Sequence, residues 1–367
     1  MHENDVPTPA LIIDLAATRR NIDRMATYAA KHDIALRPHT KTHKSLRVAG
    51  MQRDAGASGL AVAKAGEARI LSEAHDDIMV AYPVLDTPRT TIIAELARRT
   101  TMRTALDSQF SIDRVAEAAR AAGSTVGVLV DFDTGMHRTG VQTPEQTVDL
   151  AKHVETTDGV RLDGLFTYQG NIVGSEPQIV EGVTKAGETI QHVLGLWSEH
   201  GLEAGIVTGG STPTARWTHH NKPINEMRPG TYIYYDRDCL VIDACTIDDC
   251  AGRIVATVVS DAVPGKVVLD CGNKTLAMDQ LPPHVWEKFG GGHGLIVEYP
   301  DAKIDHLTEE HGRVDVTQCD RVPKLGERVH VIPNHICVCV NLQTHVWFKD
   351  EDGQVEQAAV DTRGMLS

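Results

Sequence analysis

The feature that most restricts the fold of this chain is a regular alternation of short β-type runs with amphipathic helical segments over about the first 230 residues. Alternating units of this kind predict a parallel sheet, because parallel strands need a crossover between them. The β-type runs number eight, which favours a closed (β/α)8 barrel over an open sheet. We expect strands over residues 35–37, 59–63, 77–81, 102–106, 125–130, 162–166, 204–207 and 223–227, and helices over 16–30 and 111–122.

The pattern changes near residue 240, where helical periodicity fades and strand-like runs follow one another. All seven cysteines also lie beyond residue 238. We therefore predict two domains, a barrel over residues 1–240 and a mostly β domain over residues 241–367. The strands expected in the second domain cover residues 252–259, 266–269, 294–297, 328–332, 336–340 and 344–348.

Charge and composition exclude several classes of protein. The chain has 36 basic and 50 acidic residues and a net charge of −14, which disfavours a nucleic-acid partner. Its apolar runs are shorter than the roughly 20 residues that cross a bilayer, and its first residues do not resemble a signal peptide. The sequence therefore predicts a cytoplasmic protein without a membrane partner, and the odd number of cysteines favours reduced thiols.

A basic segment, residues 37–44, directly follows the first predicted barrel strand. The carboxyl ends of barrel strands form the catalytic face, so Lys41 would lie there among cations that include Arg37 and His39. Such a lysine would have a depressed pKa, as a Schiff base with an aldehyde cofactor requires. A solvated basic turn explains the same residues, and spacing alone favours that simpler interpretation.

Three further loops carry polar groups at predicted strand ends. Residues 131–140 combine two carboxylates with Arg138, which fits either a ligand contact or an Asp–Arg pair in a turn. Residues 207–214 offer backbone N–H groups for a phosphate, in the barrel position where phosphates usually bind, although an ordinary Gly-Ser turn has the same composition. Residues 226–236 contain Arg228 and Tyr232, which suit either an anionic ligand or a packed domain junction.

The segment 333–341 holds a possible pair of metal ligands. If residues 336–340 form a strand, His335 and Cys337 point to the same side, because side chains two apart in a strand share a face. An imidazole beside a thiolate suits zinc or a similar metal, and Cys339 on the same face is a possible third ligand. A buried histidine packed between small cysteines is the alternative.

Taken together and in this order, these segments resemble the D-threonine aldolase and D-serine dehydratase family, whose barrel is shared with bacterial alanine racemase. The resemblance extends from Thr8 to Cys337. It implies pyridoxal 5′-phosphate bound by Lys41, a divalent metal (Zn, Mn, Mg or Co) bound by His335 and Cys337, and a homodimer. It also implies catalytic roles for Lys41 and His39. The cofactor-binding residues implied are Lys41, Arg138, Tyr168, Thr208, Gly209, Gly210, Ser211, Arg228 and Tyr232.

The same resemblance implies a lyase that acts on β-hydroxy D-amino acids. A His-x-Cys motif, here His335 and Cys337, is typical of the dehydratases of the family, and a His-x-Asp motif of the aldolases. Gln169 stands where both branches usually carry a histidine, and a glutamine cannot act as a base. We therefore expect β-elimination of D-serine, D-threonine or 3-hydroxy-D-aspartate to a 2-keto acid and ammonia. Retro-aldol cleavage to glycine and an aldehyde, an amino-acid racemase and a non-catalytic cofactor-binding protein are the alternatives.

Overall fold

The structure is a computed structural model that describes the backbone of residues 1–367 and every side chain except those of residues 287 and 288. Its contacts divide the chain into two units. The barrel unit comprises Asp23–Lys41, Ser45–Gly230 and Gly364–Ser367, and the strand unit comprises Met1–Ile22, Thr42–Lys44 and Thr231–Arg363. The chain therefore passes between the units several times, and the single boundary near residue 240 stays a prediction.

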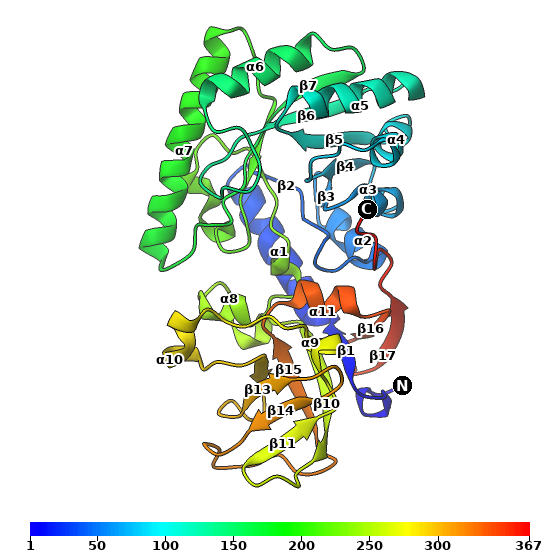
Figure 1. Cartoon of the computed structure of the whole chain (residues 1–367), viewed down its shortest axis with the longest axis vertical. Coiled ribbons are helices and arrows are strands. Elements are labelled where there is room, and N and C mark those ends of the chain that lie inside the picture. The colour runs from blue at the N-terminus through cyan, green and yellow to red at the C-terminus, as the bar shows by residue number, and fades with distance from the viewer. The chain divides into compact units, whose positions relative to one another are not determined.

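The barrel unit contains one parallel sheet of eight strands, in the order β2-β9-β8-β7-β6-β5-β4-β3 (Figure 1). Hydrogen bonds also join its two ends: the Ala61 N–H donates to the Pro38 carbonyl at 2.9 Å and the Thr40 N–H to the Ala61 carbonyl at 2.8 Å. The expected (β/α)8 fold is confirmed. The strands are β2 (Ala35–Leu36), β3 (Leu60–Val62), β4 (Asp77–Val80), β5 (Thr101–Leu106), β6 (Val126–Asp131), β7 (Val160–Phe166), β8 (Ile206–Gly209) and β9 (Glu226–Met227).

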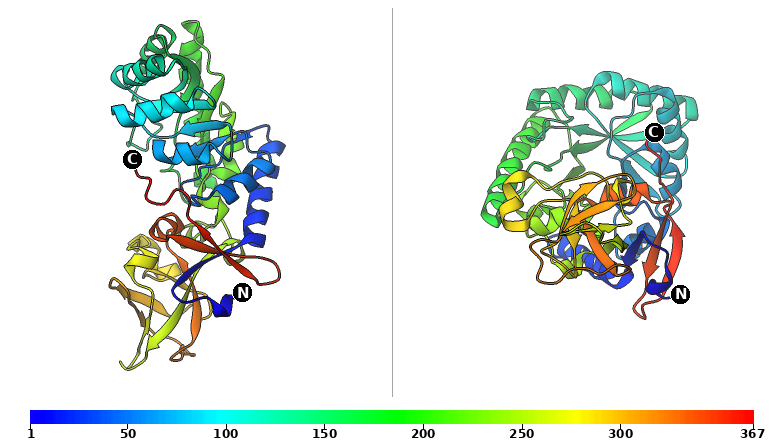
Figure 2. Two further views of the ribbon diagram at one scale, coloured as in Figure 1. Left: turned by 90° about the vertical axis from the view of Figure 1, so that its right-hand side faces the viewer. Right: turned by 60° about the horizontal axis from the view of Figure 1, so that its bottom comes forward.

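Helices lie outside these strands, as the right-hand view in Figure 2 shows. α5 illustrates why: Ser108 accepts the Ser111 N–H at its start, Gly123 ends it with φ +64°, and its apolar side packs into the core. No helix in the described chain combines the length and the apolar character needed to cross a membrane. The helices are α2 (Leu46–Asp54), α3 (Ala65–Leu71), α4 (Thr87–Leu96), α5 (Gln109–Ala122), α6 (Pro144–Glu155) and α7 (Glu176–Glu199), with the 3-10 helix η2 (Ala215–His220).

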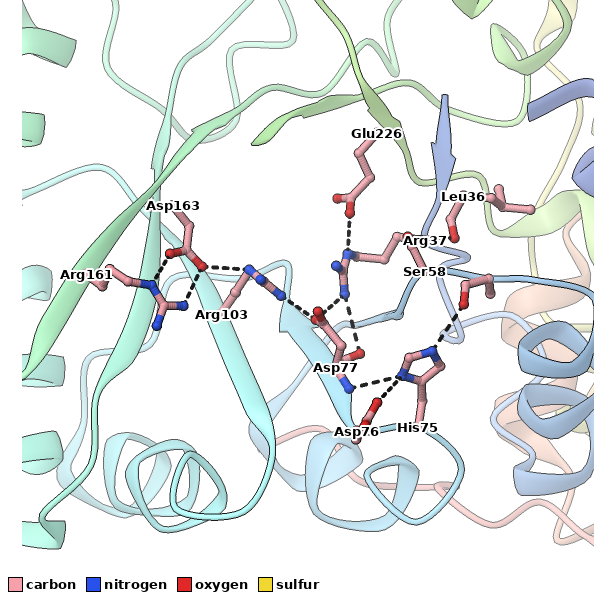
Figure 3. Close-up of polar contacts among 11 residues, drawn as sticks. Leu36, Arg37, Ser58, His75, Asp76, Asp77, Arg103, Arg161, Asp163 and Glu226 are labelled. Carbon is pink, nitrogen blue, oxygen red and sulfur yellow. Dashed lines mark hydrogen bonds and ion pairs between the residues drawn. The ribbon is translucent and has the colours of Figure 1, made fainter. Parts of the chain in front are cut away.

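A network of ion pairs lies among the barrel strands (Figure 3). Arg37 is 2% exposed and donates to Glu226 Oε2 at 2.8 Å and to Asp77 Oδ1 at 2.7 Å. Arg103 bridges Asp77 and Asp163. Burial lowers the pKa of Arg37, but the two carboxylates outweigh it and raise that pKa above its usual value. Arg37 is thus neutralised by two partners and does not act as an unpaired cation beside Lys41.

Two glycines provide the space that this network needs. A Cβ atom at Gly59 would lie 2.0 Å from Arg37 Nη1, and one at Gly127 would lie 2.2 Å from Asp163 Oδ2. Side chains at these positions would collide with the charged groups. The glycines and the ion pairs therefore form one packed arrangement.

The strand unit contains a nine-stranded sheet, whose main path runs β13-β14-β11-β10-β1-β16-β17, while β15 pairs with β10 and β12. β1 (Ala10–Asp14) pairs antiparallel with β10 and parallel with β16, so the first strand of the chain lies between strands from its last third. The other strands are β10 (Gly252–Ser260), β11 (Lys266–Leu269), β12 (Gly294–Ile296), β13 (Lys303–Leu307), β14 (Gly312–Asp315), β15 (Arg328–Pro333), β16 (His345–Lys349) and β17 (Val355–Ala359).

Short helices connect these strands, and α1 (Leu15–Lys31) leads from the strand unit into the barrel unit. The short helices are η1 (Glu3–Asp5), η3 (Thr231–Ile233), α8 (Arg237–Val241), η4 (Ile247–Asp249), α9 (Asn273–Leu276), η5 (Pro283–Val285), α10 (Trp286–Phe289) and α11 (Ile336–Leu342).

The strand expected over residues 336–340 is wrong, because this segment forms α11. Its β-branched residues favour a strand, but Ile336, Cys339 and Val340 are the buried positions, which is helical spacing. Cys339 therefore does not share a strand face with Cys337, and its thiol donates to the Leu276 carbonyl at 3.1 Å. Tertiary packing has overridden the local preference of the segment.

Candidate active site and metal ligands

Five predicted site segments follow five neighbouring strands of the barrel sheet. The sheet order places β2, β9, β8, β7 and β6 side by side, and all of them are parallel. Their carboxyl ends therefore lie at one end of the sheet, which is the catalytic end in barrel enzymes. The residues at these ends are Lys41, Arg228, the loop Gly209–Gly210–Ser211, Tyr168 and Arg138.

Two of the hydrogen bonds that hold the loop around Lys41 involve His39. The Lys41 N–H donates to His39 Nδ1 at 3.3 Å, and the His39 N–H donates to the Pro229 carbonyl at 2.9 Å. Because Nδ1 accepts, a neutral His39 carries its proton on Nε2. The backbone before Lys41 is thus tied to the segment that contains Arg228.

Arg228 is a buried cation with fixed partners. It donates to the Thr208 hydroxyl and, at 2.6 Å, to the Thr167 carbonyl, and its guanidinium lies 3.8 Å from the centre of the Phe166 ring. Burial lowers the pKa of Arg228 to about 10. These contacts fix the direction in which its remaining donors point.

The glycine loop after β8 is closed by Gln169. The Gly210 N–H donates to Gln169 Oε1 at 2.6 Å, and Gln169 Nε2 donates to the Thr167 hydroxyl at 2.8 Å. The Ser211 hydroxyl donates to the Gln169 carbonyl at 3.2 Å. A Cβ at Gly209 would lie 2.4 Å from Ile224, so this position admits no side chain. Gln169 thus connects two loops and does not replace the expected histidine as a base.

Arg138 lies on an exposed loop above Tyr168. Its guanidinium carbon is 4.6 Å from the centre of the Tyr168 ring, a cation–π distance. Asp133 organises this loop by accepting the N–H groups of Gly135 and Met136 at 2.9 and 2.8 Å. Burial raises the pKa of Asp133, but these backbone bonds outweigh it and the pKa lies below its usual value. Arg138 and Tyr168, both in the cofactor-binding set that the family resemblance implies, are therefore neighbours.

The pKa of Asp131, at the end of β6, is shifted in the opposite direction to that of Asp133. Asp131 is buried, and burial together with the charge of Asp107 raises its pKa to about 6, against the lowering effects of Thr139, Arg228 and Arg138. This carboxyl group can therefore change its protonation state near neutral pH.

The two predicted metal ligands lie in the strand unit, and the structure brings them together. His335 precedes α11 in an extended conformation and forms a hydrogen bond with Cys337. Its Nδ1 lies 3.1 Å from Asp236 Oδ2, and the Cys337 sulfur lies 3.1 Å from the Thr42 hydroxyl. Burial lowers the pKa of His335, but the bonds to Asp236 and Cys337 outweigh it and raise that pKa to about 11.

The proposed metal site has few protein ligands. Among the described residues there is no group of three or more His, Cys, Asp or Glu side chains arranged to hold a metal. A metal on His335 and Cys337 would therefore keep positions open for water or substrate. Tyr232, also in the strand unit, is fully buried in η3.

The chain is similar to known proteins over most of its length. Residues 13–238 match the model described as the alanine racemase N-terminal domain, and residues 251–348 match a putative serine dehydratase domain. A D-threo-3-hydroxyaspartate dehydratase from Delftia sp. is 30% identical over 348 residues, which cover 90% of each chain. The chain belongs to the D-threonine aldolase and D-serine dehydratase family.

Other members of this family agree in sequence and in fold. A D-threonine aldolase from Arthrobacter sp. is 28% identical, with 92% of this chain and 87% of that protein covered. The crystal structure of D-threonine aldolase from Filomicrobium marinum has 29% identity and a TM-score of 0.92, with 100% of this chain and 98% of that chain covered. A variant of D-threo-3-hydroxyaspartate dehydratase, solved in a metal-free form, has a TM-score of 0.86 at 26% identity, with 98% of both chains covered.

Sequence reasoning missed two contacts made by residues of these segments. The bond from Gln169 to Gly210 links positions 41 residues apart, and the bond from Asp236 to His335 links positions 99 residues apart. Asp236 does leave a local signal, because Asp three residues before Cys239 is the spacing of a helix N-cap. Its contact with His335 leaves none, since it depends on the folded strand unit.

Proposed function

We propose that this protein is a lyase that uses pyridoxal 5′-phosphate and a divalent metal and acts on β-hydroxy D-amino acids. The observation that carries the proposal is the presence in one chain of Lys41 at the carboxyl end of a barrel strand and of the hydrogen-bonded pair His335 and Cys337. Membership of the D-threonine aldolase and D-serine dehydratase family supports the same activity.

The residues at the barrel end fit pyridoxal phosphate. Lys41 supplies a partly exposed amine, and Gly210, with φ +81°, lies in a loop with the hydroxyl group of Ser211. Arg228 supplies a buried guanidinium for the ring nitrogen, and Arg138 and Tyr168 supply further polar contacts. A phosphate in the loop would compete with Gln169 for the Gly210 N–H. Tyr232 and Thr208 complete the proposed set.

His335 and Cys337 fit a divalent metal. An imidazole nitrogen and a thiolate suit Zn²⁺, Co²⁺ or Mn²⁺ better than Mg²⁺, which prefers oxygen. The structure of a D-threo-3-hydroxyaspartate dehydratase variant described as a metal-free form supports a metal in this family. A metal held by His335 and Cys337 would supply a Lewis acid for the β-hydroxyl group of the substrate.

The remaining chemistry is assigned to side chains of this chain. Pyridoxal phosphate, when bound, supplies an electron sink for the charge that develops at the substrate Cα. The Lys41 amine removes the Cα proton, and His39, with its proton on Nε2, is suited to donate a hydrogen bond or a proton. β-Elimination then expels the hydroxyl group and leads to a 2-keto acid and ammonia.

Gln169 favours elimination over retro-aldol cleavage. Retro-aldol cleavage needs a group that takes the proton of the β-hydroxyl, whereas elimination needs only Lys41 as base. The Gln169 amide does not titrate, and it is bonded to Gly210 and Thr167. Retro-aldol cleavage is the second candidate, because the Arthrobacter and Filomicrobium relatives are D-threonine aldolases. A racemase is the third.

A product assay on D-threonine separates these reactions. The purified protein is incubated with D-threonine, pyridoxal phosphate and Mn²⁺ or Zn²⁺, with Lys41→Ala as the inactive control. We expect 2-ketobutyrate and ammonia. Glycine with acetaldehyde would replace this proposal with the aldolase, and L-allothreonine formed in the presence of EDTA would identify a racemase. If the protein forms none of these products, the lyase proposal is contradicted altogether.

We also propose a cytoplasmic homodimer whose partners are small D-amino acids, with no nucleic-acid or membrane partner. The net charge of −14 supports the absence of nucleic-acid binding. Light scattering on the purified protein tests the dimer.

A further inference from the structure

One buried carboxylate in the strand unit contacts three separate groups. Asp236 is 0% exposed. Its Oδ1 accepts the N–H of Cys239 at 3.0 Å and begins α8, while its Oδ2 accepts the N–H of Ile336 at 3.1 Å at the start of α11. The same Oδ2 lies 3.1 Å from His335 Nδ1. One side chain therefore joins the starts of two helices to an imidazole.

We propose that Asp236 is a positioning residue that makes His335 a metal ligand through Nε2. A carboxylate can only accept hydrogen bonds, so the ring must carry a proton on Nδ1 to contact it. In the neutral ring the lone pair then lies on Nε2, which is the nitrogen left for a metal. This inference rests on the metal site in the proposed function, and it adds which nitrogen binds and which residue selects it.

Asp236 also fixes the direction of the ring. The carboxylate cannot turn toward another partner without losing the N–H groups of Cys239 and Ile336, both of which are buried. Partners of this kind orient metal-binding histidines and raise their basicity. The two backbone bonds thus hold Asp236, and Asp236 holds His335.

A second acidic residue provides a matched control. Asp238 Oδ2 lies 3.9 Å from the same nitrogen, beyond hydrogen-bond distance, and its side chain is 46% exposed. Replacing either Asp236 or Asp238 by asparagine removes one negative charge near His335. Only the replacement of Asp236 changes the group in contact with Nδ1: asparagine keeps a single acceptor oxygen, so it cannot make all three contacts with Cys239, Ile336 and His335.

The test compares metal binding by Asp236→Asn and Asp238→Asn in the full chain loaded with pyridoxal phosphate. Equilibrium dialysis gives the Kd for Mn²⁺ and Zn²⁺, and the charge-transfer absorbance of bound Co²⁺ reports the Cys337 thiolate. We expect Asp236→Asn to weaken metal binding by about 10- to 100-fold, because a neutral amide replaces the carboxylate that orients the imidazole and raises its basicity. We expect Asp238→Asn to change it by less than about threefold, because only a partly exposed charge is lost. The cofactor absorbance should be the same in both variants.

Equal weakening in the two variants, or unchanged binding in a folded Asp236→Asn, would overturn the inference. If the wild-type protein binds no metal, the metal part of the proposed function fails with it, so the two failures are distinguishable. Should Asp236→Asn not fold, long-range ¹⁵N NMR of the histidine-labelled, Zn²⁺-loaded wild-type protein decides. A proton on Nδ1 of His335, assigned with His335→Gln, supports the proposal, and a proton on Nε2 overturns it.

Discussion

Replacing Arg37 by methionine should destabilise the barrel unit strongly. The side chain is 2% exposed and pairs with Asp77 and Glu226, so its loss leaves Glu226 without its cation and leaves Asp77 with Arg103 as its partner. Removing one partner of a buried ion pair lowers the free energy of unfolding by about 3–5 kcal/mol. The barrel unit has about 210 residues, for which about 4 kcal/mol lowers the Tm by about 10 °C.

The matched control is Arg161→Met, because Arg161 also pairs with a network carboxylate, Asp163, but is 53% exposed. It should cost less than about 1 kcal/mol, since an exposed pair is screened by water. The double variant Arg37→Met/Glu226→Gln should recover about 1 kcal/mol or more of the loss, because it removes the charge that Arg37→Met leaves unpaired. Thermal unfolding followed by circular dichroism measures all three. A Tm for Arg37→Met within about 3 °C of the Arg161→Met value would refute the reasoning.

Three further predictions follow from the described contacts. Lys41→Ala should abolish the visible absorbance of bound pyridoxal phosphate, and an unchanged spectrum would refute the assignment of this lysine. Hydrogen bonds to Glu298 and Glu3 raise the pKa of His330 from 6.5 to about 9, so their stabilisation is complete below pH 6.5 and is lost as the pH rises through 9. His330→Gln should therefore cost about 2 kcal/mol at pH 6 and little at pH 10, as Tm measurements across this range would report; a difference independent of pH would contradict this linkage. Gln169→Leu removes the acceptor that competes with a phosphate for the buried Gly210 N–H and should lower the Kd for pyridoxal phosphate about tenfold, as fluorescence titration would detect. An unchanged or raised Kd would show that the phosphate does not use the Gly210 N–H.

Much of the barrel could be predicted because its strands are short and buried. β6, for example, is buried at all six positions and stands out as an apolar run between polar turns. The segment of α11 was misjudged, since isoleucine, valine and cysteine favour a strand and the helix depends on contacts such as Asp236 with Ile336. Local composition cannot record a partner 100 residues away.

In the candidate site, too, local features could be predicted and contacts between distant residues could not. Lys41, Arg228 and the loop at Gly210 could be located because each follows a predicted strand, and strand ends share one side of a barrel. The direction in which the Arg37 side chain points could not be predicted, because whether an arginine side chain enters a barrel depends on carboxylates from other strands. Gln169 was recognised as a departure from the family pattern, but its bond to Gly210 required coordinates.

The position of β1 between β10 and β16 also has a consequence for synthesis of the chain on the ribosome. Leu11 pairs with Ile254, and Ile12 pairs with Trp347, so the first strand is made long before either partner. At about 5–20 residues per second, β1 waits on the order of 20–60 s for β16. Until β10 has been made, the apolar residues Ala10–Ile13 of β1 have no partner strand in the sheet, which is the condition under which nascent chains aggregate or recruit chaperones. We therefore expect the yield of folded protein to depend on translation rate and chaperone supply, even in variants whose equilibrium stability is unchanged.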